Sequence, residues 1–473
     1  MTLYTNNVIR KVGVLLIFWY YKNMKVTPKI FRAYDIRGIY PKELNKNTAY
    51  FVGKAFCLFL KGYYKISCPK IVVGHDVRLS SPLLYKKIKE GICAAEGKIL
   101  DLGFCSTPLN YFTVWHKKAD GGIMVTASHN PKEYNGFKLS LRKVKALSTQ
   151  KGTKVIYEKI LRLQKTPCRI KRVEKVDVLD RYFKFLEKEI KGTDLSCIKI
   201  IVDFANGSMG PIFKEFAKRF SIQYKPLFEK PDGNFPNHDP NPLKEENQRT
   251  IKKYLKKGGF DLGVMFDGDG DRIYFLDEKA NFIRADYILA LLAKNYLKNS
   301  KSKYIVCDLR ASRQVEDVIK KAGGKLIRSK VGYPFIKKEM EKYKAFLGGE
   351  LSGHYFWKDS CYSEASLLTL LRLMEVLKSS KKPLSALIKP IARYASSKEI
   401  NFEVEDKQAK IKELKKIYKD GKISELDGLT VEYKNWWFNI RPSNTEPVLR
   451  LTVEAKTKKL LEQKIEELTR LIG

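Results

Sequence analysis

The sequence predicts an α/β protein built from three similar α/β units followed by a smaller α+β unit. Three apolar, β-branched runs each end in an aspartate and enter a polar turn, and these aspartates are Asp76, Asp203 and Asp308. A helix-like segment follows each turn, so one strand-turn-helix pattern occurs three times at wide spacing. The length of 473 residues also exceeds what one hydrophobic core organises, so several domains are expected.

The helices of these units have recognisable starts. Residues 80–82 (Ser-Ser-Pro), residues 209–211 (Met-Gly-Pro) and Ser312 are of types that commonly begin helices, and each set follows one of the three runs. The alternation of strand and helix favours mainly parallel sheets covered on both faces, with mixed sheets as the alternative.

The C-terminal unit begins after a segment at 378–397 that contains Pro383, Pro390 and several lysines. Beyond it, residues 399–404 are typical of a strand and residues 407–417 of a helix. We therefore expect four domains, at 24–177, 178–281, 282–393 and 394–473.

Residues 12–21 form an apolar run behind two basic residues. The run is shorter than the roughly 20 residues that a membrane-spanning helix needs, and no small-residue cleavage site follows it. We expect residues 1–23 to be an N-terminal extension, with Met24 as an alternative start, and we expect no membrane partner. The eight cysteines include no C-x-x-C pair, which is typical of free thiols in a reducing cytoplasm.

The formal charge of +39 is spread along the chain and interleaved with acidic residues. A lysine-rich solvated surface accounts for this distribution, as does a long-range field that attracts small anions. We therefore expect small anionic ligands and no nucleic-acid partner.

The most informative loop is T-A-S-H-N-P at 126–131, which follows an apolar run and precedes N-G-F-K at 135–138. It predicts an exposed turn after a strand, with Ser128 presented as a nucleophile. Asn-Pro and Asn-Gly are turn formers, so a serine that only bonds to backbone is an equal alternative. No G-x-S-x-G elbow surrounds Ser128, which disfavours a hydrolase nucleophile.

A second loop, D-G-D-G-D-R, joins two strand-like runs and carries Asp267, Asp269 and Asp271. Their alternate spacing can turn all three carboxylates the same way, and three oxygen ligands suit Mg²⁺. An EF-hand is excluded because Arg272 stands where its loop requires glycine, and because the flanks are strand-like. A solvated acidic turn remains the alternative.

Two further loops carry groups that bind polar ligands. The G-G-E-L-S-G-H loop at 348–354 can bind the hydroxyls of a polyol through Glu350, Ser352 and His354, although His354 alone could be structural. The R-P-S-N-T-E-P loop at 441–447 offers phosphate-binding groups, with an ordinary capped turn as the alternative. Its candidate residues are Arg441, Ser443, Asn444 and Thr445.

One such loop falls in each predicted unit, and together they supply a nucleophile, a metal site, a sugar site and a phosphate site. The chain has no P-loop, no G-x-G-x-x-G turn and no zinc-ligand spacing, so it need not bind a nucleotide.

With these loops in this order, the sequence resembles the alpha-D-phosphohexomutase family and, within it, the phosphomannomutase/phosphoglucomutase branch. The resemblance runs from about Lys29 to the C-terminus. It includes F-R-A-Y-D-I-R-G at 31–38, G-H-D-V-R-L-S-S-P at 74–82 and P-D-G-N-F-P-N-H-D-P-N-P at 231–242. It implies four domains around a central cleft, the first three of one shared α/β topology with mixed sheets and the fourth a smaller α+β domain.

The resemblance also implies a role for each loop. Ser128 would carry a phosphoryl group, and Mg²⁺ would be held by the three aspartates and by an oxygen of the phosphorylated Ser128. The other implied site residues are Arg37, Lys138 and Arg272 to steady the transferring phosphate, His129 as a further catalytic candidate, Glu350, Ser352 and His354 for the sugar, Arg441, Ser443, Asn444 and Thr445 for the second phosphate, and Tyr34, Asn130, Arg310 and Tyr333 as other cleft candidates.

The implied reaction interconverts hexose 6-phosphate and hexose 1-phosphate, with mannose, glucose or both as the sugar. The phosphoserine would donate to the free hydroxyl, and the resulting hexose 1,6-bisphosphate would turn in the cleft and return its other phosphate. We expect Mg²⁺ and the bisphosphate as cofactors, and a monomer, with a dimer as the alternative. The alternative activity is that of a phosphoglucosamine mutase, and the alternative of another class is an inactive sugar-phosphate-binding homologue.

Two positions depart from the pattern of the branch, which usually has histidine at Tyr333 and methionine at Leu351. A tyrosine with an ordinary pKa of about 10 is a poor base at neutral pH, so the proton acceptor is left open among Lys138, Arg37 and His354. Leucine in place of methionine is expected to preserve the loop.

Overall fold

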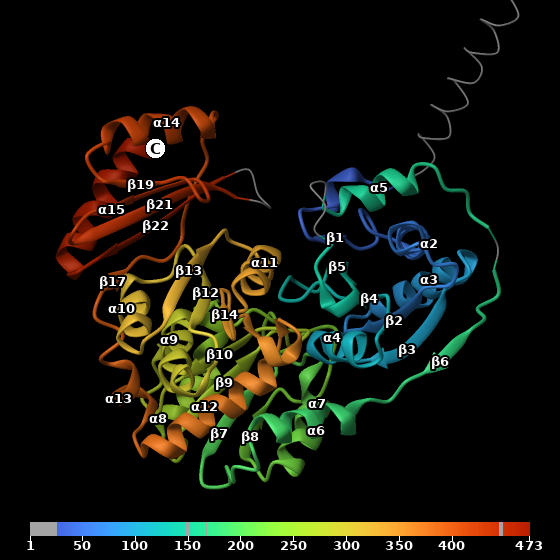
Figure 1. The fold of residues 1–473 in the computed structure, drawn as a ribbon, viewed down its shortest axis with the longest axis horizontal. Helices are drawn as coiled ribbons and strands as arrows, with labels where there is room; N and C mark the ends of the chain where they lie inside the picture. Colours follow the sequence, from blue (N-terminus) through green and yellow to red (C-terminus); the bar gives the residue numbers. More distant parts are fainter. Residues whose placement is uncertain (1–25, 148–151, 167, 444–447) are drawn as a thin grey trace, which may run out of the picture.

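The structure is a computed structural model, and it describes residues 26–147, 152–166, 168–443 and 448–473. The predicted extension at 1–23 and two predicted phosphate-binding residues, Asn444 and Thr445, lie outside the described residues. The chain forms four sheets in sequence order (Figure 1). In Figure 1 the first domain is on the right, the fourth is at the upper left, and the second and third lie between and below them.

The first domain holds a six-stranded sheet of order β1-β5-β4-β2-β3-β6. Alternate residues of β2 face opposite sides, so Ile71 and Val73 join the core on the α2 and α3 side while Val72 joins the core beside α4. Its elements are η1 (Pro28–Ile30), β1 (Asp35–Ile39), α2 (Lys46–Tyr64), β2 (Lys70–His75), α3 (Ser81–Ala94), β3 (Lys98–Phe104), α4 (Thr107–His116), β4 (Gly121–Val125), β5 (Tyr134–Leu141), η2 (Arg142–Val144), α5 (Lys154–Ile160) and β6 (Val173–Lys175).

The second domain holds a five-stranded sheet of order β11-β10-β9-β7-β8. Its last strand lies at Phe282–Ile283, so this sheet extends past residue 281. Its elements are α6 (Leu179–Glu189), β7 (Lys199–Asp203), α7 (Met209–Arg219), β8 (Gln223–Leu227), η3 (Glu245–Gln248), α8 (Arg249–Lys256), β9 (Leu262–Phe266), β10 (Ile273–Leu276) and β11 (Phe282–Ile283).

The third domain holds a five-stranded sheet of order β13-β12-β14-β15-β16. Its elements are α9 (Ala285–Tyr296), η4 (Leu297–Asn299), β12 (Tyr304–Asp308), α10 (Arg313–Lys321), β13 (Lys325–Ser329), α11 (Tyr333–Tyr343), β14 (Leu347–Gly349), β15 (Tyr355–Trp357), η5 (Lys358–Ser360), β16 (Ser363–Glu364), α12 (Ser366–Ser380) and α13 (Leu384–Ile388).

These three sheets share one topology. In each, the strand that ends in or just before the predicted aspartate (β2, β7 or β12) is central and pairs in parallel with a strand on either side, and one of those neighbours pairs with an antiparallel strand. The prediction of three α/β units with mixed sheets is therefore confirmed. The repeat places a polar turn of each unit at the carboxyl end of its central strand, where α/β proteins usually bind ligands.

The fourth domain is an antiparallel sheet of order β17-β22-β21-β20-β19, with β18 paired to β22. Its two helices pack on one face of this sheet, where Leu414, Leu461 and Leu468 meet Phe438 and Val453. The predicted smaller α+β domain is confirmed. Its elements are β17 (Ala395–Ser396), β18 (Ile400–Phe402), α14 (Lys407–Ile417), β19 (Lys422–Ser424), β20 (Leu429–Glu432), β21 (Trp436–Pro442), β22 (Leu449–Ala455) and α15 (Lys458–Ile472).

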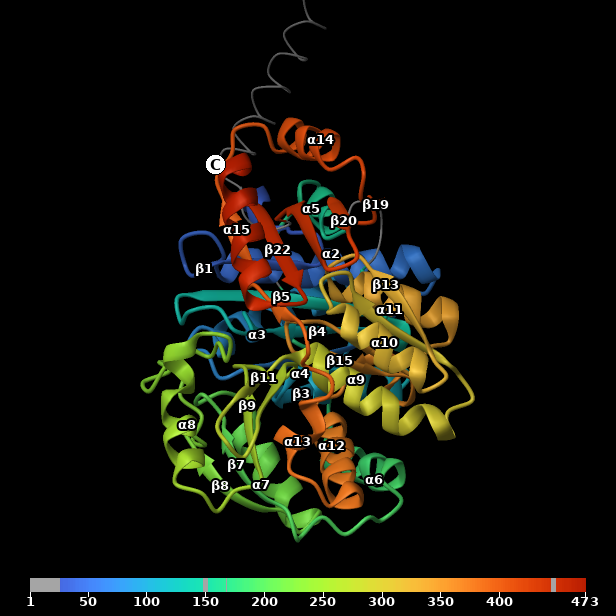
Figure 2. The same ribbon diagram turned by 90° about the vertical axis from the view of Figure 1, so that its left-hand side faces the viewer.

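The hydrophobic cores show how the domains are joined. One continuous core runs from the second sheet through α9 into the third sheet and α12, and it includes Phe204, Phe266, Ile288 and Leu370. The fourth domain has a separate core, and in Figure 2 its helices α14 and α15 lie at the top of the described part of the molecule. Domains II and III are therefore held together by apolar packing. Among the described residues, no helix is long and apolar enough to cross a membrane.

Candidate active site

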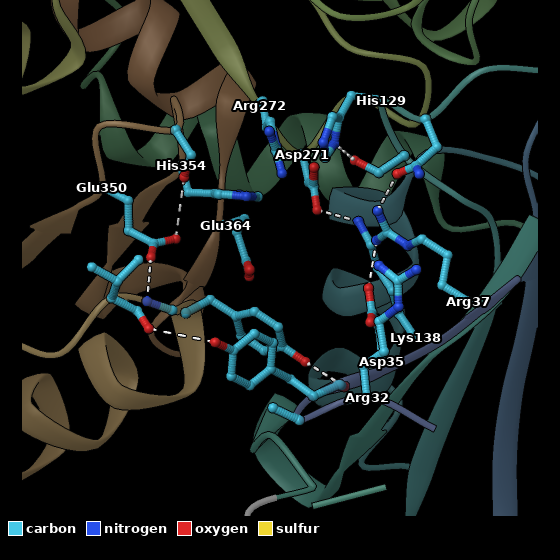
Figure 3. A pocket seen from close by; sticks show the side chains of 18 of the residues that line it. Arg32, Asp35, Arg37, His129, Lys138, Asp271, Arg272, Glu350, His354 and Glu364 are labelled. Atoms are coloured by element: carbon cyan, nitrogen blue, oxygen red, sulfur yellow. Dashed lines mark hydrogen bonds and ion pairs between the residues drawn. The ribbon is translucent and has the colours of Figure 1, made fainter. Parts of the chain in front are cut away.

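Residues from all four domains line one cavity of about 520 Å³. Figure 3 labels side chains of domains I, II and III around this cavity. All four loops predicted to carry chemistry contribute to its lining, and each comes from a different domain. The predicted site residues that line it are Tyr34, Arg37, Ser128, His129, Asn130, Lys138, Asp271, Arg272, Arg310, Tyr333, Glu350, Ser352, His354 and Arg441.

The serine loop is held from behind by Arg78, whose side chain is fully buried. Its guanidinium donates to the carbonyls of Ser128 (2.8 Å) and Asn130 (2.6 Å), and to those of Pro131 (2.7 Å) and Tyr134 (3.0 Å). Asp76, at the end of the first repeated strand unit, forms an ion pair with the same guanidinium at 3.2 Å. The loop backbone is therefore fixed by one buried cation, and Ser128 itself adopts a left-handed conformation with φ of 52°.

The Ser128 hydroxyl points at the aspartate loop. It donates to Asp267 Oδ2 at 2.7 Å, and its oxygen lies 3.3 Å from His129 Nδ1. Burial and the nearby Arg272 cation hold the pKa of His129 well below its usual value, so the ring is neutral. The structure thus brings together the predicted nucleophile and the predicted metal loop from two different domains.

Asp267, Asp269 and Asp271 are all buried, and each offers an oxygen within 4.8 Å of the others. The loop turns at Gly270, whose φ of 72° suits glycine, and the backbone N–H groups of Gly270 and Arg272 donate to Asp267 Oδ1 at 3.0 and 3.3 Å. Burial and the two other carboxylates raise the pKa of Asp267 well above its usual value. The triad therefore needs positive charge nearby.

Lys138 supplies part of that charge. Its ammonium donates to Asp269 Oδ2 at 2.6 Å and also contacts Asp271 Oδ2. Burial alone would lower the pKa of Lys138, but Asp269 and Asp271 raise it, so this lysine stays protonated. One ammonium faces three carboxylates, and Asp269 Oδ1 and Asp271 Oδ1 have no hydrogen-bond partner in the described part of the chain. This oxygen-rich, electron-rich cluster fits a hard divalent cation such as Mg²⁺.

Two arginines complete the cationic wall around Ser128. Arg37 lies on β1, beside the strand that carries Lys138, and donates to Asn130 Oδ1 at 2.6 Å and to Asp35 at 2.5 Å. Arg272 follows the triad, with its Nε 3.7 Å from Asp267 Oδ2. These side chains and Lys138 border the space in front of the serine, where an anionic group would be neutralised.

The third-domain loop presents Glu350 at the end of β14. The Gly332 N–H donates to Glu350 Oε1 at 2.8 Å, and the Ser352 hydroxyl lies 3.5 Å from Oε2. Burial and the neighbouring Asp308 carboxylate raise the pKa of Glu350 to about 7. Burial and Arg272 hold the pKa of His354 well below its usual value. The loop can therefore offer a carboxylate, a hydroxyl and a neutral imidazole to a polar ligand.

Tyr333, which stands where the branch usually has histidine, bridges two domains. Its hydroxyl donates to the carbonyl of Tyr34 at 3.2 Å, and the two rings meet edge to face with centroids 5.7 Å apart. Burial and the Asp35 carboxylate raise the pKa of Tyr333 well above its usual value. Tyr333 is thus a hydrogen-bond donor and not a proton acceptor at neutral pH.

At the fourth domain, three guanidinium groups meet one carboxylate. Glu399 pairs with Arg310 of domain III at 3.1 Å, with Arg441 at 3.1 Å and with Arg450 at 3.2 Å. All four side chains line the cavity. Ser443 is described but does not line it, and its N–H donates to the Val448 carbonyl at 2.9 Å.

Sequence reasoning missed several residues of this site. Glu364, Glu399 and Arg450 line the cavity although none belongs to a predicted loop, and Arg78 fixes the serine loop from outside the cavity. Arg78 lies in the quoted segment 74–82, but a polar turn gives no sign that its guanidinium is buried. Glu364 lies in β16, Arg450 in β22 and Glu399 directly before β18, and their local sequence carries no ligand-binding pattern.

The fold and this site define a four-domain α/β protein whose interdomain cavity is equipped for metal-assisted phosphate chemistry. Comparison with known families agrees. The chain matches all four family models described as phosphoglucomutase/phosphomannomutase: domain I over 28–166, domain II over 180–280, domain III over 284–394 and the C-terminal domain over 399–471. The protein belongs to the phosphoglucomutase/phosphomannomutase family.

Similar proteins cover nearly the whole chain. A protein of Methanocaldococcus jannaschii named phosphomannomutase is 41% identical over 448 residues, which are 94% of this chain and 97% of that one. A protein of Pseudomonas putida named phosphomannomutase/phosphoglucomutase is 34% identical over 90% of this chain and 91% of its own. A crystal structure of a phosphoglucomutase/phosphomannomutase family protein from Burkholderia thailandensis superposes with a TM-score of 0.85 at 32% identity, covering 94% of this chain and 97% of that one.

Proposed function

We propose that this protein is a phosphohexomutase that interconverts the 6- and 1-phosphates of mannose and glucose through a phosphorylated Ser128. The observation that carries the proposal is the position of the Ser128 hydroxyl, 2.7 Å from an oxygen of the buried aspartate triad. The same serine borders a cavity that holds three guanidinium groups from domains III and IV. A hexose bisphosphate needs both features, because one phosphate reacts while the other is held.

Mg²⁺ fits the triad, because two of its buried oxygens have no partner among the described residues and a single ammonium faces three carboxylates. Asp267, Asp269 and Asp271 would hold the ion together with the group on Ser128. When bound, Mg²⁺ would neutralise charge on the transferring phosphoryl group.

The chain's own residues supply the remaining chemistry. In the first half-reaction, the sugar hydroxyl oxygen bonds to phosphorus while the bond between phosphorus and Ser128 Oγ breaks, and the hydroxyl proton passes, in net terms, to Ser128 Oγ. In the second, Ser128 Oγ bonds to the other phosphorus of the hexose 1,6-bisphosphate while the bond from that phosphorus to the sugar oxygen breaks. The Ser128 proton passes, in net terms, to the sugar oxygen, which leaves the isomeric monophosphate. Lys138, Arg37 and Arg272 stabilise the negative charge in both directions, and Lys138 acts as a fixed cation because it stays protonated.

The remaining residues orient the substrate. Glu350 accepts sugar hydroxyls, and Ser352 and His354 offer further hydrogen bonds. Arg441, with Arg310 and Arg450, binds the phosphate that does not react. The roles of Ser443, Asn444 and Thr445 stay predictions from the sequence, as do the domain boundaries, a monomeric state, a cytoplasmic location and the lack of a nucleic-acid partner.

The test is a parallel assay of mannose, glucose and glucosamine phosphates, with Mg²⁺ and a trace of the matching hexose 1,6-bisphosphate. We expect turnover of mannose and glucose phosphates, loss of turnover in Ser128→Ala, and one phosphate on Ser128 by mass spectrometry. Ser424→Ala, at an exposed position on β19, is the matched control and should behave as the wild type.

Each other outcome has a definite meaning. Turnover of glucosamine phosphate alone would replace the substrate by that of a phosphoglucosamine mutase. Binding of sugar phosphates without turnover or phosphorylation of Ser128 would make the protein an inactive binding homologue. Full activity in Ser128→Ala would refute the mechanism.

A further inference from the structure

A second group of metal-ligating side chains lies beside the aspartate triad. Asp271, His354 and Glu364 each offer one ligand atom, and these atoms lie within 4.8 Å of one another. Asp271 comes from the domain II loop, His354 from the turn after β14, and Glu364 from the short edge strand β16. All three line the cavity, and Figure 3 shows them around the same space.

The three side chains are buried, and each has one polar atom without a hydrogen-bond partner among the described residues. Their exposed fractions are 2% for Asp271, 7% for His354 and 2% for Glu364. Asp271 Oδ1, His354 Nδ1 and Glu364 Oε2 are each enclosed without a hydrogen-bond partner among the described residues. Buried polar atoms are usually partnered, so one unpartnered atom on each of three adjacent buried side chains indicates a group that binds there.

The nearby lysines do not fill this place. The Lys138 ammonium contacts Asp271 through Oδ2, which leaves Oδ1 available. Lys337 interacts electrostatically with Glu364, but its ammonium donates to the Val144 carbonyl at 2.6 Å and lies 5.5 Å from the centre of the Tyr111 ring. Two carboxylates and an imidazole therefore meet without a cation in direct contact with all three.

We propose that Asp271, His354 and Glu364 form a second divalent-cation site that shares Asp271 with the triad. The triad offers only oxygen, which suits Mg²⁺, whereas the second site contains an imidazole and so favours Mn²⁺ or Zn²⁺. Three protein ligands leave coordination positions open, and all three residues line the cavity. An oxygen of a phosphate or of a sugar hydroxyl would complete the coordination, as in sites where two cations clamp one phosphate.

The test measures cation binding directly and does not depend on turnover, so its outcome is separate from that of the proposed reaction. Full-length protein is stripped of metal with a chelator and titrated with Mn²⁺, with stoichiometry from elemental analysis after desalting and the spin state from electron paramagnetic resonance. We expect two Mn²⁺ per chain and a spin-coupled spectrum, because the two ions share one carboxylate.

Variants separate the two sites. Glu364→Gln should bind one Mn²⁺ and give the six-line spectrum of an isolated ion, and Asp267→Asn should bind one Mn²⁺ in the second site. Glu96→Gln removes the same charge at an exposed position and should bind two. Circular dichroism tests whether each variant is folded. If Glu364→Gln does not fold, His354→Gln is used in its place.

Two results would overturn the proposal. One is a wild-type protein that binds a single Mn²⁺ at saturation with an uncoupled six-line spectrum, which decides the matter without any variant. The other is a folded Glu364→Gln that still binds two Mn²⁺ with the coupled spectrum, because the second ion would then use other ligands.

Discussion

Replacing Arg78 by alanine should loosen the serine loop while leaving the sequence of the site intact. The guanidinium donates to four backbone carbonyls of this loop and pairs with Asp76, with both side chains fully buried. Each hydrogen bond from a charged donor contributes about 1.5–3 kcal/mol, but these values do not add, because burying the ions costs solvation. Removing one partner of a buried pair typically costs about 3–5 kcal/mol, and we expect a loss in this range.

The assay is native-state amide hydrogen exchange of residues 126–136, read by mass spectrometry. Because each 1.4 kcal/mol is a factor of ten, a loss of 3–5 kcal/mol should raise exchange by about 100- to 4,000-fold if the loop opens locally. We expect turnover to fall by about 100-fold as well, since a displacement of about 1 Å of a reacting group has that effect. Arg78→Lys should be intermediate, because one ammonium cannot reach four carbonyls.

A matched control is Arg142→Ala, in the same domain. Arg142 is nearly half exposed and pairs with Asp120, so its loss should cost less than about 1 kcal/mol and leave the loop unchanged. If Arg78→Ala exchanges within about threefold of the wild type, the reasoning is wrong. The loop would then be held by its own turn, in which the Ser128 N–H donates to Thr126 Oγ1 at 2.9 Å.

Three further predictions concern the cavity. Lys138→Met removes the ammonium that competes with a metal ion for the triad. Mg²⁺ should therefore bind about tenfold more tightly by calorimetry, while turnover falls at least 100-fold. Weaker Mg²⁺ binding would contradict this prediction. Tyr333→Phe removes only the hydrogen bond to the Tyr34 carbonyl, so its turnover should stay within about fivefold of the wild-type value. A loss of more than about 1,000-fold would show that Tyr333 takes part in proton transfer. The pKa of Glu350 is raised to about 7 by burial, so its carboxylate forms as pH rises through 7, and kcat/KM should rise with pH and then level off. The pKa of Glu350 is higher in the folded protein than in the unfolded chain, where it is about 4.3, so the free energy of unfolding should fall as pH rises from about 4.3 through 7. Glu350→Gln should remove the pH dependence of kcat/KM and this contribution to the pH dependence of the free energy of unfolding.

The repeated units could be predicted because their signals are local. An apolar run, an aspartate and a helix start recur around Asp76, Asp203 and Asp308, and each lies at the carboxyl end of a central strand. The four loops could be predicted because each concentrates its chemistry within a few residues. That Ser128 would touch Asp267 followed from the family resemblance and not from either loop alone, since contact across 139 residues depends on how two domains pack.

Residues that act through tertiary placement alone gave no local signal. Glu364 stands in a two-residue edge strand, and it joins the cavity only because β16 pairs with β15 beside the His354 turn. Arg450 belongs to β22, and Glu399 lies directly before β18. The local sequence around each residue is typical of an ordinary strand. Their role depends on domain IV folding back over domain III, which no pattern within either segment encodes.

The contacts between domains III and IV differ in kind from those between domains II and III. Domain IV has its own core, and it meets domain III through polar contacts such as Arg310 to Glu399 at 3.1 Å and the Val331 N–H to Asp427 at 3.0 Å. A phosphate entering the cavity therefore meets guanidiniums that already have an anionic partner. The net gain in binding free energy is therefore the attraction of the three cations for the phosphate minus their attraction for the Glu399 carboxylate. In the proposed reaction, an exchange of this kind would let a bisphosphate bind firmly enough to react and still release one end in order to turn.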